Sequence, residues 1–181
     1  MKRSFSMLLL VAFVGSVGCR GAVAEAPAPD ALTDANIAAI VVTANTADIL
    51  YADMALAKSQ TPAVRQFAQM VKTDHQSVNE AAGALVARLG VTPVMNTLAF
   101  DLRDDAETKR LTLRDFEGIA FDSAYAANEI SYHQTVLDAI DQALIPGAQN
   151  AELKALLVQV RPAVAAHLEH ARHLSAQVGR R

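Results

Sequence analysis

The chain has 181 residues, with 16 lysines and arginines, 19 acidic residues, five histidines and a single cysteine. Its mildly acidic balance, without a basic cluster, argues against nucleic acid as a partner. One cysteine excludes an intrachain disulfide, and the length suits one domain large enough to bury a core.

The first residues follow the pattern of a secretory signal. Lys2 and Arg3 precede an apolar run over residues 7–14, and small residues then lead to Cys19. The run is too short to span a bilayer as a mature helix, and no other run approaches that length. We therefore expect residues 1–18 to be a signal peptide that exports the protein to the cell envelope.

Two cleavage sites are compatible with this signal. Cys19 resembles the lipidated cysteine of bacterial lipoproteins, although Ser16 stands three residues before it, where leucine is preferred. The alternative is ordinary cleavage after Ala24, with Ala22 as the other small residue of the signal. We favour lipidation of Cys19, which predicts a periplasmic protein tethered to the outer membrane by its lipid and touching the membrane in no other way. Arg20, which is not the aspartate of inner-membrane lipoproteins, favours the outer membrane.

The composition then divides the mature chain, which carries a net charge of −5 from residue 19 onward. Residues 19–32 are rich in alanine and proline and have no periodicity, so they predict a flexible tether. Residues 33–179 remain for one folded domain.

The first half of that domain predicts two long helices. One should begin near Thr33 or Asp34 and run to about Ser59. The next should start at Thr61-Pro62, with the threonine hydroxyl as its cap, and stop at Gly90. The short loop between them requires an antiparallel pair. The apolar stripe of the first helix contains one acid: Ile37, Val41, Ala44, Asp48, Tyr51 and Ala55. The stripe of the second helix contains one histidine: Val64, Phe67, Val71, His75, Val78, Ala82, Leu85 and Leu89.

The second half predicts a connection and two more helices. Residues 91–118 form the connection, with a short amphipathic helix over residues 98–115. A third long helix should cover residues 119–145 and be broken by Pro146-Gly147. Asn150 should cap the fourth, whose stripe includes His167 and whose interior Pro162 should bend it. No segment alternates with period two, so the predicted fold is all-α, a four-helix bundle with the ferritin-like connectivity of two hairpins joined by a long crossover.

Three segments of this domain resemble a known family. They are VRQFAQMVKTDH, FDSAYAANEISYHQTVL and RPAVAAHLEHARHL. Together they resemble the bacterial domain-of-unknown-function family 4142, often labelled outer membrane proteins, over residues 34–177. The resemblance implies a ferritin-like four-helix bundle in an exported protein, and it implies no activity.

A candidate metal site follows from the heights of the polar residues along the bundle. Asp48, His75 and His133 lie near the middles of their helices and His167 slightly past the middle of its own, which places them within about one turn of one level. Asp74 flanks His75, and Glu129 lies one turn before His133. Three imidazoles with carboxylates at one level can bind a divalent transition metal. A hydrogen-bonded polar layer that only fixes the register of the helices is the competing interpretation.

The sequence offers no catalytic residue. A di-iron centre of this architecture needs a glutamate three residues before its histidines, but Lys72 and Val164 stand at those positions before His75 and His167. His170 and His173 extend the run from His167, most simply as a solvated helix face. Two hypotheses therefore stand: an envelope protein that binds a transition metal, or a non-catalytic structural or interaction module whose protein partner the sequence does not identify.

Overall fold

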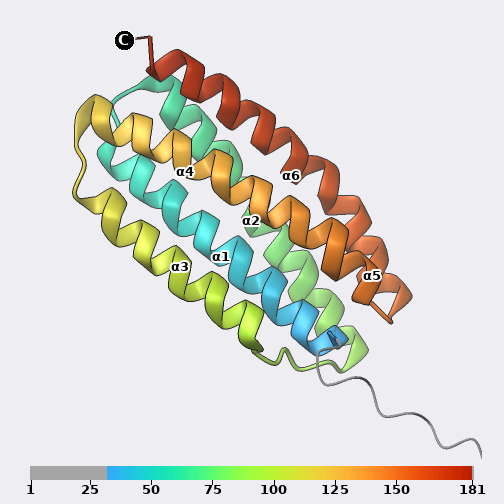
Figure 1. Ribbon diagram of the computed structural model, residues 1–181. Helices are drawn as coiled ribbons and strands as arrows, with labels where there is room; N and C mark the ends of the chain where they lie inside the picture. The colour runs from blue at the N-terminus through green and yellow to red at the C-terminus, as the bar shows by residue number, and fades with distance from the viewer. Residues whose placement is uncertain (1–31, 181) are drawn as a thin grey trace, which may run out of the picture. The chain divides into compact units, whose positions relative to one another are not determined.

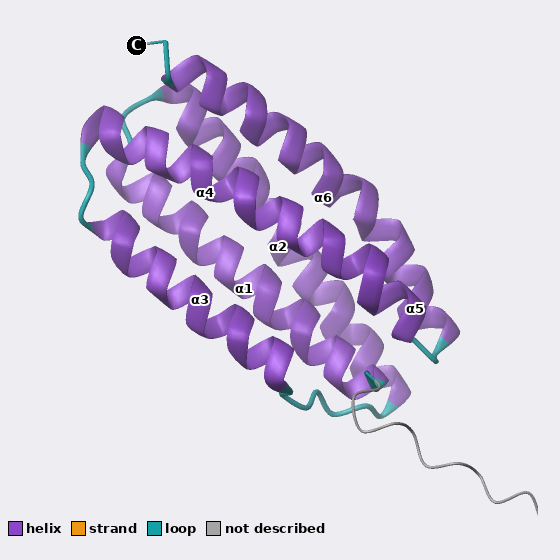
Figure 2. Ribbon diagram, in the orientation of Figure 1, coloured by secondary structure: helices purple, strands orange, loops and turns teal. Residues whose placement is uncertain are grey.

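The computed structural model describes residues 32–180; the predicted signal peptide, Cys19 and residues 20–31 of the tether lie outside this part of the chain. All of its regular elements are helices (Figure 2), which confirms the all-α prediction for the described residues. Five of them have 18 residues or more: α1 (Asp34–Lys58), α2 (Pro62–Leu89), α3 (Thr97–Arg114), α4 (Gly118–Ala139) and α6 (Ala151–Val178).

Four of these helices form a bundle, and α3 lies against the outside of α1 (Figure 1). α1 pairs with α2 and α4 pairs with α6, each pair joined by a short loop and therefore antiparallel. α3 runs parallel to α1. At one end the Val94 N–H donates to the Ala35 carbonyl (3.0 Å), and at the other Lys58 Nζ donates to the Arg114 carbonyl (2.5 Å). The chain thus crosses the full length of the bundle before α4 begins, so that α4 runs parallel to α2.

The start of α1 agrees with the predicted cap. Asn36 N–H donates to Thr33 Oγ1 (3.1 Å) and Thr33 N–H donates to Asn36 Oδ1 (3.2 Å), which is a reciprocal capping box. Leu32, the last residue of the predicted tether, packs with Ile37 beside Gly147 at the same end of the bundle. The stripe predicted for α1, including Asp48, is buried throughout.

The start of α2 corrects one prediction. Pro62 is the first helical residue as expected, but the Thr61 hydroxyl makes no capping hydrogen bond. It donates instead to Asp122 Oδ2 of α4 at 2.5 Å. A buried carboxylate competes successfully for this hydroxyl, because an unpaired charge inside the protein costs more free energy than an unfilled helix cap at the surface. The end of α2 is as predicted, with Gly90 in the left-handed conformation at φ 64°.

The end of α4 also differs from the prediction. The helix does not stop before Pro146: it continues through a π-helical turn (Ile140–Leu144) into α5 (Ile145–Gly147). In the π turn the Ile145 N–H donates to the Ile140 carbonyl, five residues back. Proline lacks an N–H and its ring crowds the carbonyl four residues earlier, and the wider turn accommodates this. α6 in turn is continuous through Pro162, which is exposed, and the predicted bend there stays a prediction.

α1 corrects the expectation that only the signal approaches transmembrane length. Its length and apolar composition alone would allow it to cross a bilayer. However, it is the central helix of the domain, packed against α2, α3 and α4, and it buries the ionisable Asp48. An apolar helix surrounded by partners is a core helix, and that accounts for its composition.

Candidate functional site

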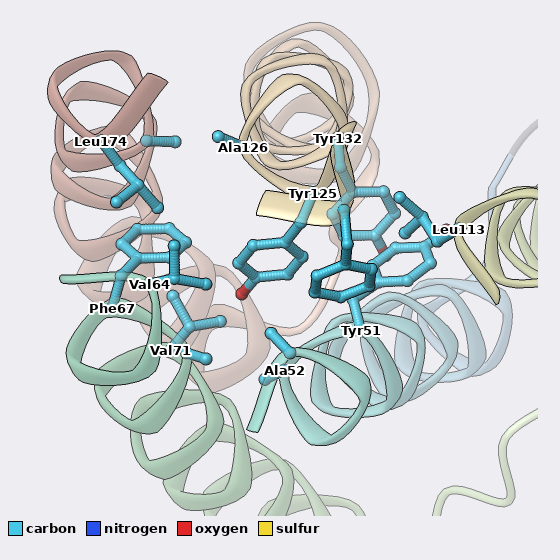
Figure 3. Close-up of a cluster of buried hydrophobic side chains, with 14 of the residues drawn as sticks. Tyr51, Ala52, Val64, Phe67, Val71, Leu113, Tyr125, Ala126, Tyr132 and Leu174 are labelled. Carbon is cyan, nitrogen blue, oxygen red and sulfur yellow. The ribbon is translucent and has the colours of Figure 1, made fainter. Parts of the chain in front are cut away.

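The predicted site residues meet in the middle of the bundle, one or two from each of its four helices. Asp48 comes from α1, His75 from α2, Glu129 and His133 from α4, and His167 from α6, and all five are buried. We call these five residues the histidine layer. The layer lies between two apolar clusters of the bundle. The upper cluster, around Val71 and Tyr125, lies towards the end where α1 stops and α2 begins; the lower cluster, around Ile140, Leu157 and Val164, lies towards the end where α1 begins. Figure 3 shows the upper cluster.

The three histidine rings form a compact triangle. Their centroids are 5.8 Å apart for His75 and His133, 5.4 Å for His75 and His167, and 5.3 Å for His133 and His167. One ring nitrogen from each lies within 4.8 Å of those of the other two. Tetrahedral ligands at the usual metal–nitrogen distance stand about 3.3 Å apart, so the three nitrogens are within reach of one ion.

Each histidine uses its other ring nitrogen to donate a hydrogen bond to an oxygen outside the triangle. His75 Nδ1 bonds Asn45 Oδ1 (2.7 Å), His133 Nδ1 bonds the Glu129 carbonyl (3.0 Å), and His167 Nε2 bonds Asp74 Oδ2 (2.9 Å). The Asn45 amide oxygen faces His75 because its Nδ2 donates to Asn79 (3.0 Å). Oxygen acceptors of this kind fix the tautomer of a neutral imidazole and leave a lone pair on the opposite nitrogen.

Those opposite nitrogens face one another and two carboxyl groups. Seven buried atoms of the layer have no hydrogen-bond partner of acceptable geometry among the described residues: His75 Nε2, His133 Nε2, His167 Nδ1 and both carboxyl oxygens of Asp48 and Glu129. Asp48 Oδ2 is nevertheless only 2.9 Å from His75 Nε2 and 3.1 Å from His133 Nε2. These atoms are close but poorly aligned for a hydrogen bond. Nitrogen lone pairs and carboxylate oxygens at such distances repel unless a positive charge lies between them, either a proton or a metal ion.

Protons supply part of that charge when no metal is bound. Burial would raise the pKa of Asp48, but His133 and His75 outweigh it and hold that pKa well below its usual range. Burial lowers the pKa of His133, but the Asp48 carboxylate outweighs it and the net pKa is raised. Burial, and then Asp48, raise the pKa of Glu129 well above its usual range, whereas burial lowers the pKa of His167. These directions favour an ionised Asp48 and the protonated forms of Glu129 and His133 in the metal-free layer.

These shifts predict that the metal-free protein loses stability as pH rises above 7. The raised folded-state pKa values of His133 and Glu129 mean that both groups stabilise the fold when protonated, and this contribution is lost as pH passes through those values. Asp48 and His167, whose pKa values are lowered, titrate below pH 7 and do not oppose the trend. We expect the melting temperature in chelator to fall as pH rises above 7, and His133→Gln to make that slope shallower, with Glu129 accounting for the part that remains. A metal-loaded site should show the opposite trend, because protons compete with the metal for imidazole nitrogen.

The other predicted residues lie around the layer. Asp74 is half-exposed and holds His167 from outside the triangle, so the structure places it behind a candidate ligand. Lys72 points away and pairs with Asp53 (2.6 Å), while His170 and His173 are exposed beside a surface groove between α2 and α6. Cys19, the predicted lipidation site, lies outside the described residues.

One polar residue near the layer, Asn45, was missed by sequence reasoning. Asn45 lies one turn before Asp48 on the buried face of α1, and an amide on an apolar stripe is the signal that would have found it. The Tyr125 hydroxyl, drawn in Figure 3 within the upper cluster, has no partner among the described residues. The other two tyrosines donate to backbone carbonyls, Tyr51 to Ala106 (3.2 Å) and Tyr132 to Ala44 (2.7 Å).

Comparison with known proteins gives a family and no activity. No curated protein and no solved structure matches the chain. One family model does match, over residues 20–174, which is most of the sequence and includes every residue of the histidine layer. The chain therefore belongs to the family described as Domain of unknown function (DUF4142).

Proposed function

We propose that the protein binds one divalent transition metal ion in the histidine layer. The ligands are His75 Nε2, His133 Nε2 and His167 Nδ1, with Asp48 as a carboxylate ligand. One observation supports this most strongly: each histidine donates its outer N–H to an oxygen and turns an unpaired nitrogen inward. That arrangement of outer acceptors is what metal-ligating histidines require. Imidazole and carboxylate ligands suit zinc, copper, nickel and ferrous iron.

The competing function is a structural or interaction module whose polar layer binds no metal. The raised pKa of His133 favours it, because a protonated His133 can pair with Asp48 without an ion. However, a layer made only to fix helix register should satisfy its own donors and acceptors, since buried polar groups without partners are costly. Here the inward atoms of all four bundle helices have no hydrogen-bond partner among the described residues. We therefore favour metal binding, and we assign no catalytic residue and no reaction.

The deciding measurement is thermal unfolding of the purified protein with added Zn²⁺ or Cu²⁺ and with chelator. Binding to the folded state alone stabilises it by about 2.7 kcal/mol at a free metal concentration 100 times Kd. We expect the melting temperature to rise with metal, to fall back with chelator, and one ion to be retained per chain. A melting temperature that neither addition changes would leave the metal-free layer as the function of these residues.

The arrangement of the bundle supports a finer description of the fold as ferritin-like. The two hairpins are joined by a crossover that carries α3 along α1 and makes α2 and α4 parallel. One long crossover between two hairpins is typical of ferritin-like bundles, and on this ground we propose that classification.

We further propose that the domain works in the periplasm, anchored to the outer membrane by a lipid on Cys19. The support is the sequence of residues 1–19. In a Gram-negative host, Cys19→Ala should abolish labelling by a fatty-acid probe and move the protein from the membrane to the soluble fraction. Unchanged fractionation would favour cleavage after Ala24. Ser16→Ala, which changes the signal without removing the thiol, serves as the matched control.

A further inference from the structure

An apolar cavity of about 50 Å³ lies directly beside the histidine layer, on the side of the lower cluster. Its apolar walls come mainly from α1, the α4 region and α6, with Val78 of α2 and Leu102 of α3, and include Ile40, Ala44, Val136, Ile140, Leu157 and Val164. Among the residues that the structure describes, the polar or charged side chains that line it are Asn45, Asp74, His75 and His167, all of which belong to the layer or support it. Asp74 and Ala163 are exposed and place its mouth between α2 and α6.

The size and lining of this cavity select its occupant. Water inside a protein needs two to four polar partners, and beyond its polar end the cavity offers none, so most of its volume is a poor site for water. An apolar cavity of about 150 Å³ accepts benzene or xenon, and one of a third that volume excludes an aromatic ring but accepts a single small apolar molecule. Away from these four side chains the walls are apolar and reject ions, because no group along that part compensates a buried charge.

The polar end of the cavity is formed in part by proposed metal ligands. His75 and His167 are two of the three proposed metal ligands, and both contribute to the cavity surface. A molecule in the cavity therefore lies against the proposed ion on a side that neither Asp48 nor Glu129 covers, because these two residues do not line the cavity.

We propose that the cavity binds a small uncharged gas molecule, of the size and polarity of dioxygen or nitric oxide, and brings it to the metal. The binding of the gas rests on the cavity alone, whereas its contact with the ion rests on the function proposed above. The π turn contributes to this arrangement, because its residues Ile140 and Leu144 both line the cavity.

Xenon tests the cavity without any metal. Metal-free protein should bind xenon, seen as a saturable ¹²⁹Xe chemical-shift change or as density in xenon-pressurised crystals. Ala44→Val adds two methyl groups to the wall and should weaken xenon binding at least tenfold. Ala82→Val, which enlarges a buried alanine of the same apolar cluster outside the cavity, should bind xenon like the wild type. Val164→Ile provides a second filling variant if Ala44→Val does not fold. Absence of xenon binding in the wild type, or equal binding in a folded filling variant, would overturn the proposal.

Nitric oxide tests contact with the metal. Protein loaded anaerobically with Fe²⁺ should give the EPR signal of a ferrous nitrosyl centre, with an affinity at least tenfold lower in Ala44→Val and unchanged in Ala82→Val. Equal nitric oxide affinity in all three would show that the gas reaches the ion by another side and would overturn the delivery role. Failure of Fe²⁺, Zn²⁺ and Cu²⁺ alike to bind would overturn the metal function and the delivery role with it, and the xenon result would still decide the cavity.

Discussion

Asp48→Asn is expected to remove tight metal binding and to destabilise the metal-free protein as well. Asp48 is fully buried and lies beside His75 Nε2 and His133 Nε2, so it is the carboxylate on which both histidines depend. The substitution keeps the shape of the side chain and removes its charge. Removing one partner of a buried ion pair costs about 3–5 kcal/mol. For a domain of this size that corresponds to a fall of roughly 6–20 °C in melting temperature.

Calorimetric titration with Zn²⁺ and thermal unfolding in chelator measure the two effects separately. Asp53→Asn is the matched control, because Asp53 lies on the same helix but is exposed and pairs only with Lys72. Its effect on stability should stay within about 0.5 kcal/mol, and its effect on metal affinity near zero. An Asp48→Asn protein that unfolds like the wild type in chelator would contradict the ion pair that the pKa directions of Asp48 and His133 describe.

The histidines should act as one unit towards the metal. His75→Ala is expected to weaken Zn²⁺ binding by more than about 100-fold, because losing a ligand costs more than the roughly 10–100-fold loss on removing an outer hydrogen-bond partner. Adding His167→Ala to that variant should change the affinity little, since the site is already lost. Asn45→Leu, which removes only the outer partner of His75, should fall in the intermediate range.

The two hypotheses predict different patterns for these variants. If the layer binds no metal, each histidine replacement leaves a buried partner unsatisfied and costs about 1–3 kcal/mol, equally with and without Zn²⁺. His170→Ala controls for loss of a histidine as such, because His170 is exposed on the same helix as His167. Stability losses that are independent of Zn²⁺ across the whole series would favour the metal-free layer.

Much of the fold could be predicted because its signals are local. The start of α1 depends on Thr33 and Asn36, which are three residues apart, and the end of α2 depends on the freedom of Gly90 to adopt a positive φ. Periodicity then places Asp48 and His75 on buried faces. Thr61 shows where local signals fail, because its hydroxyl bonds Asp122, a residue 61 positions away.

The details of the candidate site were less predictable for the same reason. Helix periodicity gives the height and the face of a histidine but not which ring nitrogen points inward. That choice depends on distant acceptors, such as Asn45, 30 residues from His75, and Asp74, 93 residues from His167. The cavity depends on the volumes of side chains from several helices at once, which no single stretch of sequence encodes.

The distribution of the proposed ligands over the two hairpins has a mechanical consequence. α1 packs more extensively on α2, and α4 on α6, than either hairpin packs on the other, so the seam between the hairpins is where the bundle would first come apart. Asp48 and His75 belong to one hairpin, and His133 and His167 to the other. An ion bound by all four of these residues would cross-link the two hairpins, and the hairpins could not separate until the ion dissociates. Bound metal would then govern how long a folded molecule survives, through the rate at which it opens, as well as its free energy of unfolding at equilibrium.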